Sequence, residues 1–261
     1  FMRVRIYLDK SIEENASLYF DKAKKLKKKV EGVKKAIDLY NKKLENIKPK
    51  ERKKQQIIKQ ETKREWYEKF RWFISSEGFL CIGGRDATTN EIIIKKHTEP
   101  DDLVFHTDMA GSPFFVIKSC GKKIGEQTIK ETADAISVYS RAWGLGLAAT
   151  NTFYVKPYQV TKKAQHGEYL AKGSFMIRGK TTYVHGEMKL AIGVKDKRII
   201  GGPVNAIKSQ TKEYAILVQG KQKASFIAKK LKQKFGSDID ELMRFLPTNG
   251  ICLLYTSDAA D

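Results

Sequence analysis

The stretch IEENASLYFDKAKKLKKKVEGVKKAIDLYNKKLENI, residues 12–47, decides how the chain is organised. Its apolar residues recur in alternating steps of four and three, beginning with Ile12, Ala16 and Tyr19 and ending at Ile47. This spacing is an a/d heptad seam over five repeats, which predicts a helix that supercoils with a partner. Such a helix is about 54 Å long at 1.5 Å per residue. We interpret it as an arm, because it is too long to pack inside a domain of this size.

The sequence also predicts where the arm begins and turns. Ser11 with Glu14 forms a capping box that opens the helix. Pro49 interrupts the seam and permits a reversal. We therefore expect residues 11–75 to form an antiparallel hairpin with its tip at about residues 48–54. The tip is well placed to contact phosphates or the ribosome, or it is simply a polar, exposed turn; its basic residues are Lys48, Lys50, Arg52, Lys53 and Lys54.

Net charge favours a polyanion as partner. The chain has 261 residues, with 50 Lys and Arg against 30 Asp and Glu, for a formal net charge of +20. Residues 11–65 are the more densely basic part, although a lysine-rich coiled-coil surface would look the same.

The cysteines and the two ends of the chain bear on its context. Cys81 and Cys120 lie in strand-like apolar runs and form no disulfide framework, so we expect a cytoplasmic protein. No apolar run approaches the length of a membrane span, and no signal peptide is recognisable. We interpret residues 1–10 as the end of a truncated upstream domain, with a short strand around residues 3–8. Residues 252–261 look like a non-native tail from a sequencing adapter, so the chain is expected to be a fragment.

The part after the arm predicts an α+β domain over residues 76–251, with a mixed or antiparallel sheet and flanking helices. The run WYEKFRWFISSEGF, residues 66–79, contains six aromatic residues, and we expect the returning helix to enter a core there and end near Ser75. Short strands are expected around residues 79–82, 103–106, 114–118, 152–155, 173–178, 182–184, 190–194 and 214–218. Helices are expected around residues 90–98, capped by Thr88 or Thr89, and at 127–143, 221–234 and 238–245.

Two short motifs could carry chemistry. In GGRDATTNE, residues 83–91, the glycines would let Arg85 project toward a phosphate or base edge with Asp86 orienting it, or the pair is only a helix cap. In HTDMAGSP, residues 106–113, His106 and Asp108 lie two apart on a strand end and share a side. They could be a general base with its orienting group, the start of a metal site, a structural pair or a polar contact to RNA. No convincing third metal ligand and no nucleophile motif accompany them, so we expect no metal, no cofactor and no catalytic residue.

A third segment, YVKPYQVTKKAQHGEYLAKGSFMIRGK at residues 154–180, interleaves lysines and arginines with aromatics and glycines. That composition suits a surface that follows an RNA backbone and stacks bases, or a β region whose aromatics are core. The RNA-facing set that we predict adds Lys118 and Arg141 to residues of these motifs and consists of Arg85, Asp86, His106, Asp108, Lys118, Arg141, Lys156, Gln159, Lys162, Lys172 and Arg178.

Taken in order, these motifs resemble a known family. Residues 66–91, the run HTDMAGSPFFVIKS at 106–119, SRAW at 140–143 and residues 154–180 closely resemble the archaeal-type NFACT-R domain. LDKSIEENASLYFDKAKKLKKK, residues 8–29, resembles the start of the coiled-coil middle region of NFACT proteins. The resemblance covers nearly all of residues 6–250, with Thr107 and Thr161 as small departures.

The resemblance implies a ribosome quality-control factor. Such proteins bind large ribosomal subunits that still hold peptidyl-tRNA, with the arm tip near the stalk base, and recruit tRNA for mRNA-independent C-terminal alanine tailing. The subunit's own peptidyl-transferase centre would make the bonds, so the chain would not be an enzyme. Its expected partners are rRNA, stalk-base protein and tRNA, with no membrane and no small-molecule substrate. The alternatives are an RNA-processing hydrolase that uses His106 and Asp108, or an adhesin or assembly coiled-coil protein.

Overall fold

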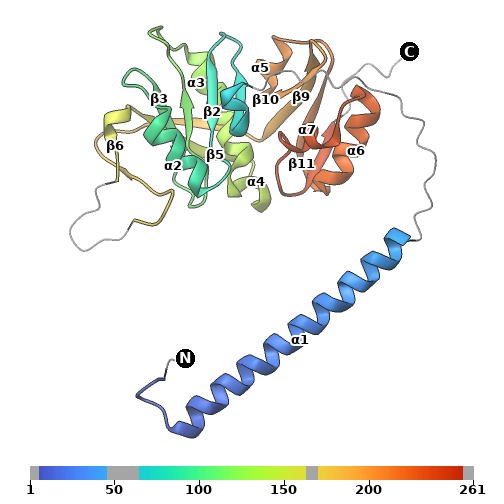
Figure 1. The fold of residues 1–261 in the computed structure, drawn as a ribbon. Helices are drawn as coiled ribbons and strands as arrows, with labels where there is room; N and C mark the ends of the chain where they lie inside the picture. Colours follow the sequence, from blue (N-terminus) through green and yellow to red (C-terminus); the bar gives the residue numbers. More distant parts are fainter. Residues whose placement is uncertain (1–5, 46–64, 163–169, 255–261) are drawn as a thin grey trace. The chain divides into compact units, whose positions relative to one another are not determined.

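In the computed structural model, residues 6–45, 65–162 and 170–254 are described. The chain divides into two compact units, Phe1–Thr62 and Lys63–Asp261. The first unit contains the long helix α1 (Ile12–Glu45), and the second is an α+β domain (Figure 1). No helix among the described residues combines the length and the apolar character that crossing a bilayer requires.

The start of α1 confirms the predicted capping box. The Ser11 amide donates to the Glu14 carboxylate at 2.9 Å, and the Glu14 amide donates to Ser11 Oγ at 3.1 Å. The expected strand around residues 3–8 is wrong for its described part, because the chain turns after Tyr7 and hydrogen-bonds to the side chain of Asn15.

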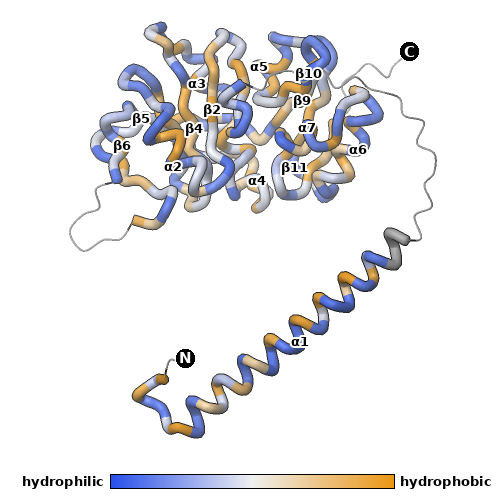
Figure 2. Tube along the Cα trace, viewed as in Figure 1, coloured by the Kyte–Doolittle hydropathy of each residue, from blue (hydrophilic) through white to orange (hydrophobic). Residues whose placement is uncertain are grey.

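The seam of α1 recurs along the helix as predicted (Figure 2). Val30, Val33 and Ile37 are each more than half exposed. A long helix is therefore confirmed, while its pairing in a coiled coil stays a prediction. The expected tip, with Lys48, Lys50, Arg52, Lys53 and Lys54, lies outside the described residues, as does most of the expected returning helix.

The end of the expected returning helix is wrong. Trp66–Lys69 is a 3-10 helix, η1, and Arg71–Ile74 is strand β1. The aromatic residues alternate here with a period of two, so Phe73 is buried against one side of the sheet and Trp72 lies on the other. Tertiary pairing with the next strand therefore replaces the helix.

The second unit is built around a six-stranded sheet in the order β1-β2-β4-β3-β5-β8. Every pairing in it is antiparallel, which settles the predicted choice between a mixed and an antiparallel sheet. The strands that follow β1 are β2 (Leu80–Gly83), β3 (Leu103–Thr107), β4 (Phe115–Ile117), β5 (Ala149–Val155) and β8 (Thr182–Glu187).

Helices cover both faces of this sheet. Phe105 and Phe115 pack with Ile136 of α3 (Glu126–Tyr139), while Val104 and Val116 pack on the α2 side. Helix α2 spans Ala87–Lys96, and its cap is Asp86 rather than the predicted Thr88 or Thr89. The helix expected over residues 127–143 breaks at Ser140, whose Oγ accepts from the Ala142 amide at 3.1 Å and caps α4 (Arg141–Leu145).

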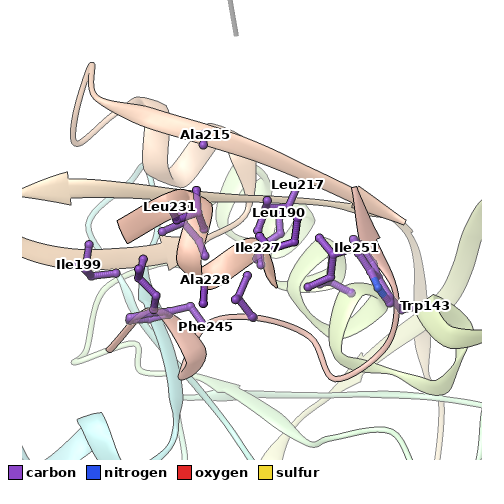
Figure 3. Close-up of a cluster of buried hydrophobic side chains, with 14 of the residues drawn as sticks. Trp143, Leu190, Ile199, Ala215, Leu217, Ile227, Ala228, Leu231, Phe245 and Ile251 are labelled. Carbon is purple, nitrogen blue, oxygen red and sulfur yellow. The ribbon is translucent and has the colours of Figure 1, made fainter. Parts of the chain in front are cut away.

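A second antiparallel sheet lies beside the first, in the order β10-β9-β11-β12. Its strands are β9 (Lys189–Lys195), β10 (Arg198–Gly202), β11 (Tyr214–Gln222) and β12 (Ile251–Leu254). Figure 3 shows its core, where Leu190 and Leu217 meet Ile227 and Leu231 of α6 (Ala224–Phe235). Residues 252–254, the first residues of the expected non-native tail, pair with β11 in this sheet. The short elements η2 (Pro157–Gln159), β6 (Val160–Thr161), β7 (Met176–Ile177), α5 (Val204–Lys208) and α7 (Ile239–Met243) complete the described part.

Candidate nucleic-acid interface

A cleft of about 310 Å³ opens where five segments of the second unit meet. Its walls are the turn before α2, the turn between β3 and β4, and the segment that leads to β7. One residue of β1 and one of α3 also line it. The lining residues are Arg71, Gly84–Ala87, Asn90, His106, Ala110–Phe114, Tyr139 and Lys172–Phe175.

Glycines let these walls approach one another. A Cβ on Gly84 would lie 1.8 Å from Asn90 Oδ1, and a Cβ on Gly173 would lie 2.5 Å from Ala87 Cα. Gly173 also has a φ of +81°, which favours glycine. The Phe114 amide donates to Asn90 Oδ1 at 3.1 Å, so the start of α2 is tied to the facing turn. The two motifs singled out in the sequence, GGRDATTNE and HTDMAGSP, therefore line one site together.

Arg85 is fixed by backbone carbonyls. Its Nη1 donates to the Arg244 carbonyl and its Nη2 to the Phe70 carbonyl, each at 3.1 Å. Asp86 does not hold this guanidinium, contrary to one of the two predicted roles. Its carboxylate instead accepts from the Thr89 amide at 2.8 Å and caps α2, and this hydrogen bond lowers the pKa of Asp86. The predicted helix-cap role of Asp86 is confirmed, and its contact with RNA stays a prediction.

Arg71 and Tyr139 belong to the site and were missed. The guanidinium carbon of Arg71 lies 3.9 Å from the centre of the Tyr139 ring, a cation–π contact. The Tyr139 hydroxyl donates to the Phe245 carbonyl at 2.7 Å, which fixes the ring. The one signal in the sequence was a single arginine within the aromatic run FRWF. Nothing local relates it to a tyrosine 68 positions later.

The two arginines make the cleft cationic. Partial burial, together with the positive charge of Arg71, lowers the pKa of Arg85 to about 10. Burial also lowers the pKa of Arg71. Both side chains still carry a full charge at neutral pH. Among the described residues, neither forms a salt bridge with a carboxylate. Asp86 brings one carboxylate to the lining, but it forms no salt bridge with either arginine. Two adjacent, partly desolvated guanidinium groups outweigh this single negative charge and favour an anionic ligand.

His106 lines the cleft, but its geometry does not match a general base paired with Asp108. The His106 Nδ1 lies 3.1 Å from the Pro113 carbonyl oxygen and donates to it, since a carbonyl can only accept. The ring stacks on Phe114 with centroids 4.0 Å apart. Burial lowers the pKa of His106, so the ring is neutral at pH 7 and its Nε2 is an acceptor. Asp108 is exposed and accepts from the Tyr183 hydroxyl at 3.3 Å.

Three further predicted residues lie at or near the cleft. Lys172 lines it and is exposed. Arg141 lies beside Gly111: a Cβ added to Gly111 would be 3.3 Å from Cδ of Arg141. Lys162 pairs with Glu91 at 3.3 Å, and its ammonium group is 4.7 Å from the centre of the Phe175 ring.

The structure places the remaining predicted residues elsewhere. Lys118 is buried, and its ammonium group contacts Asp102 at 2.5 Å, which is a structural ion pair and not a surface contact. Gln159 binds the carbonyls of Arg178 and Lys180 at 2.8 and 2.9 Å, and its Oε1 accepts from the amide of Lys156. It thereby holds the turn that carries the exposed side chains of Lys156 and Arg178.

Residues 69–179 match the family model described as the NFACT protein RNA binding domain. The chain is 42% identical over 195 residues to the archaeal Rqc2 homolog aRqcH of Methanocaldococcus jannaschii. The chain belongs to the NFACT proteins. The matched domain contains all the residues that line the cleft, and the predicted resemblance is confirmed.

Further relatives agree with this assignment. The human ribosome quality control complex subunit NEMF is 42% identical over 175 residues, 65% of this chain and 16% of that protein. The archaeal match covers 72% of this chain and 29% of its relative, so this NFACT chain spans less than a third of the length of either protein. A solved structure, the C-terminal part of the fibronectin/fibrinogen-binding protein from Streptococcus suis, is similar at 17% identity over 44% of this chain and 45% of that chain. Its TM-score of 0.37 is too low to bear on the fold.

Proposed function

We propose that this chain is the RNA-binding part of a ribosome quality-control factor. It binds large ribosomal subunits obstructed with peptidyl-tRNA and helps to recruit tRNA for mRNA-independent C-terminal alanine tailing. The human relative, named as a ribosome quality control complex subunit, and the archaeal relative, named as an Rqc2 homolog, support this role. The chain acts by binding and positioning, and the peptidyl-transferase centre of the subunit makes the peptide bonds.

The observation that carries the proposal is the cationic cleft inside the RNA-binding domain. Arg85 is held in place by two carbonyls, and Arg71 lies on the Tyr139 ring, so both guanidinium groups are preorganised. Planar guanidinium groups with fixed orientation bind phosphate oxygens with two parallel hydrogen bonds. Lys172 adds an exposed positive charge to the same lining.

Fluorescence anisotropy with labelled tRNA across a salt series tests this proposal. Binding should weaken steeply with salt, because each neutralised phosphate releases counterions. Lys172→Gln should weaken binding to every tRNA and reduce the slope of log K against log salt by about one. Lys212→Gln is the matched control, because it removes the same charge from an exposed position outside the cleft. An absence of tRNA binding by the wild-type chain at low salt would refute the proposal.

A hydrolase based on His106 and Asp108 gains no support from the geometry. The Nδ1 proton of His106 is used by the Pro113 carbonyl, so Asp108 does not orient the ring. We therefore keep a single proposed function.

A further inference from the structure

The cleft differs from the open basic surface that backbone-tracking proteins present to RNA. It is a concave site of about 310 Å³, near the lower end of the size range of small-ligand pockets. An A-form helix presents its phosphates over a broad surface and cannot enter such a space. A single unpaired nucleotide, in contrast, can leave its stack and enter the cleft.

The chemistry of the lining has two distinct parts. On one side, Arg71 and Arg85 supply fixed positive charge without a carboxylate partner in the described part of the chain. On the other side, His106 supplies an acceptor, because its Nδ1 proton is already given to Pro113. A free phosphate ion would satisfy the arginines, and its hydroxyl could donate to His106, but it carries no base to contact the aromatic walls of the cleft.

The walls also contain aromatic side chains. Phe175 lines the cleft and is only partly buried. Tyr139 also lines it, but its ring already carries Arg71 and stacks with Phe115, so Phe175 is the aromatic side chain that we assign to the base. Aromatic faces beside guanidinium groups are the usual partners of unstacked RNA bases. Phosphate, hydroxyl donors and an aromatic base together define a nucleotide.

We propose that the cleft binds one unpaired ribonucleotide of an RNA, with its phosphate at Arg71 and Arg85 and a ribose hydroxyl donating to Nε2 of His106. This inference rests on the proposed function, since it names the part of the RNA that the same domain recognises. Lys172, exposed at the opening, contacts the next phosphate along the strand.

The test is competition with small probes on the full chain. A labelled single-stranded RNA is bound first, and AMP, 2′-deoxy-AMP or inorganic phosphate is then added. AMP should displace the RNA, and 2′-deoxy-AMP and phosphate should each need at least about tenfold higher concentrations, the equivalent of one lost polar contact. A blunt RNA duplex of equal length should bind more weakly than the single strand.

Two variants separate the parts of the site. His106→Phe keeps the stacking on Phe114 but removes the acceptor, so it should abolish the preference for AMP over 2′-deoxy-AMP. Lys172→Gln changes an exposed residue. It should weaken binding of the single-stranded RNA while leaving the preference for AMP over 2′-deoxy-AMP intact. Thermal unfolding of both variants checks that they fold, and Lys212→Gln serves as the charge control.

The outcomes distinguish this inference from the proposed function. If AMP fails to displace RNA while the chain still binds tRNA in a salt-dependent way, the nucleotide site is refuted and the proposed function stands. If phosphate competes as well as AMP, the assignment of the ribose to His106 is refuted. If neither tRNA nor AMP binds, the proposed function fails as well.

Discussion

Lys118 provides a sharp test of the reasoning, because sequence and structure assign it different roles. The sequence placed it on the RNA-facing surface. In the structure its side chain is 8% exposed, and its ammonium group lies 2.5 Å from Asp102, whose side chain is 0% exposed. The ammonium group also donates to the His97 carbonyl at 3.1 Å. Lys118→Met keeps most of the volume but leaves the carboxylate of Asp102 buried without a counter-charge.

The expected cost follows from this burial. Removing one partner of a buried ion pair costs about 3–5 kcal/mol. Asp102 keeps hydrogen bonds from the amides of Ser119 at 2.9 Å and Glu99 at 2.8 Å, so we expect a value near the lower end, about 3 kcal/mol. With a urea m-value of about 2–3 kcal/mol/M, the unfolding midpoint should fall by roughly 1–1.5 M.

Urea unfolding followed by circular dichroism measures this shift, and a double-mutant cycle isolates the pair. Lys118→Met, Asp102→Asn and the double variant should give a coupling energy above about 1 kcal/mol. Binding of tRNA by the folded Lys118→Met variant should equal that of the wild type. A loss of less than about 1 kcal/mol of stability, together with weaker tRNA binding, would show that Lys118 is an RNA contact and that the structural assignment is wrong.

Three other predictions concern the cleft, a buried carboxyl and the arm. Gly173→Ala should lose about 1–3 kcal/mol of stability, because its φ is +81° and the new methyl would meet the first residue of α2; Gly236→Ala, with a φ of +65° and open space, should lose less in the same thermal melt. Burial raises the pKa of Asp134 to about 6, above its unfolded value of about 3.9, so its contribution to stability is present below pH 4 and lost as pH rises through 6. The stability of Asp134→Asn relative to the wild type should therefore be greater at pH 7.5 than at pH 4.5. If the substitution shifts the urea midpoint equally at the two pH values, this prediction is contradicted. Ser11→Ala should cost α1 about 1 kcal/mol by removing the cap, seen as lower helicity of a peptide spanning residues 6–45 by circular dichroism.

Local patterns predicted local structure well. The capping box at Ser11, the buried strand before Gly83 and the antiparallel strands on either side of HTDMAGSP follow from spacing and turn residues within a few positions. The two motifs GGRDATTNE and HTDMAGSP are each recognisable in the sequence, but no local pattern indicates that they line the same cleft. The Phe114–Asn90 hydrogen bond that brings them together joins residues 24 positions apart.

The errors arise where distant contacts decide. The sequence predicts that the returning helix extends through the run FRWFI, but pairing with β2 and packing on both faces make this run a strand. Lys118 directly follows a strand, where a lysine is usually exposed. It is buried here because it pairs with Asp102, 16 positions away. Arg71 and Tyr139 are absent from the predicted set for the same reason: their contact joins residues that are far apart in the sequence. A single sequence shows residue types, and it does not show which charge is left without a partner once the chain has folded.

The most direct measurement of the central claim is co-sedimentation of this chain with isolated large ribosomal subunits, with and without bound peptidyl-tRNA, across a salt series. The account predicts salt-sensitive binding that is stronger when peptidyl-tRNA is present and weaker for Lys172→Gln than for Lys212→Gln. Binding that ignores both peptidyl-tRNA and salt, or no binding at low salt, would contradict it.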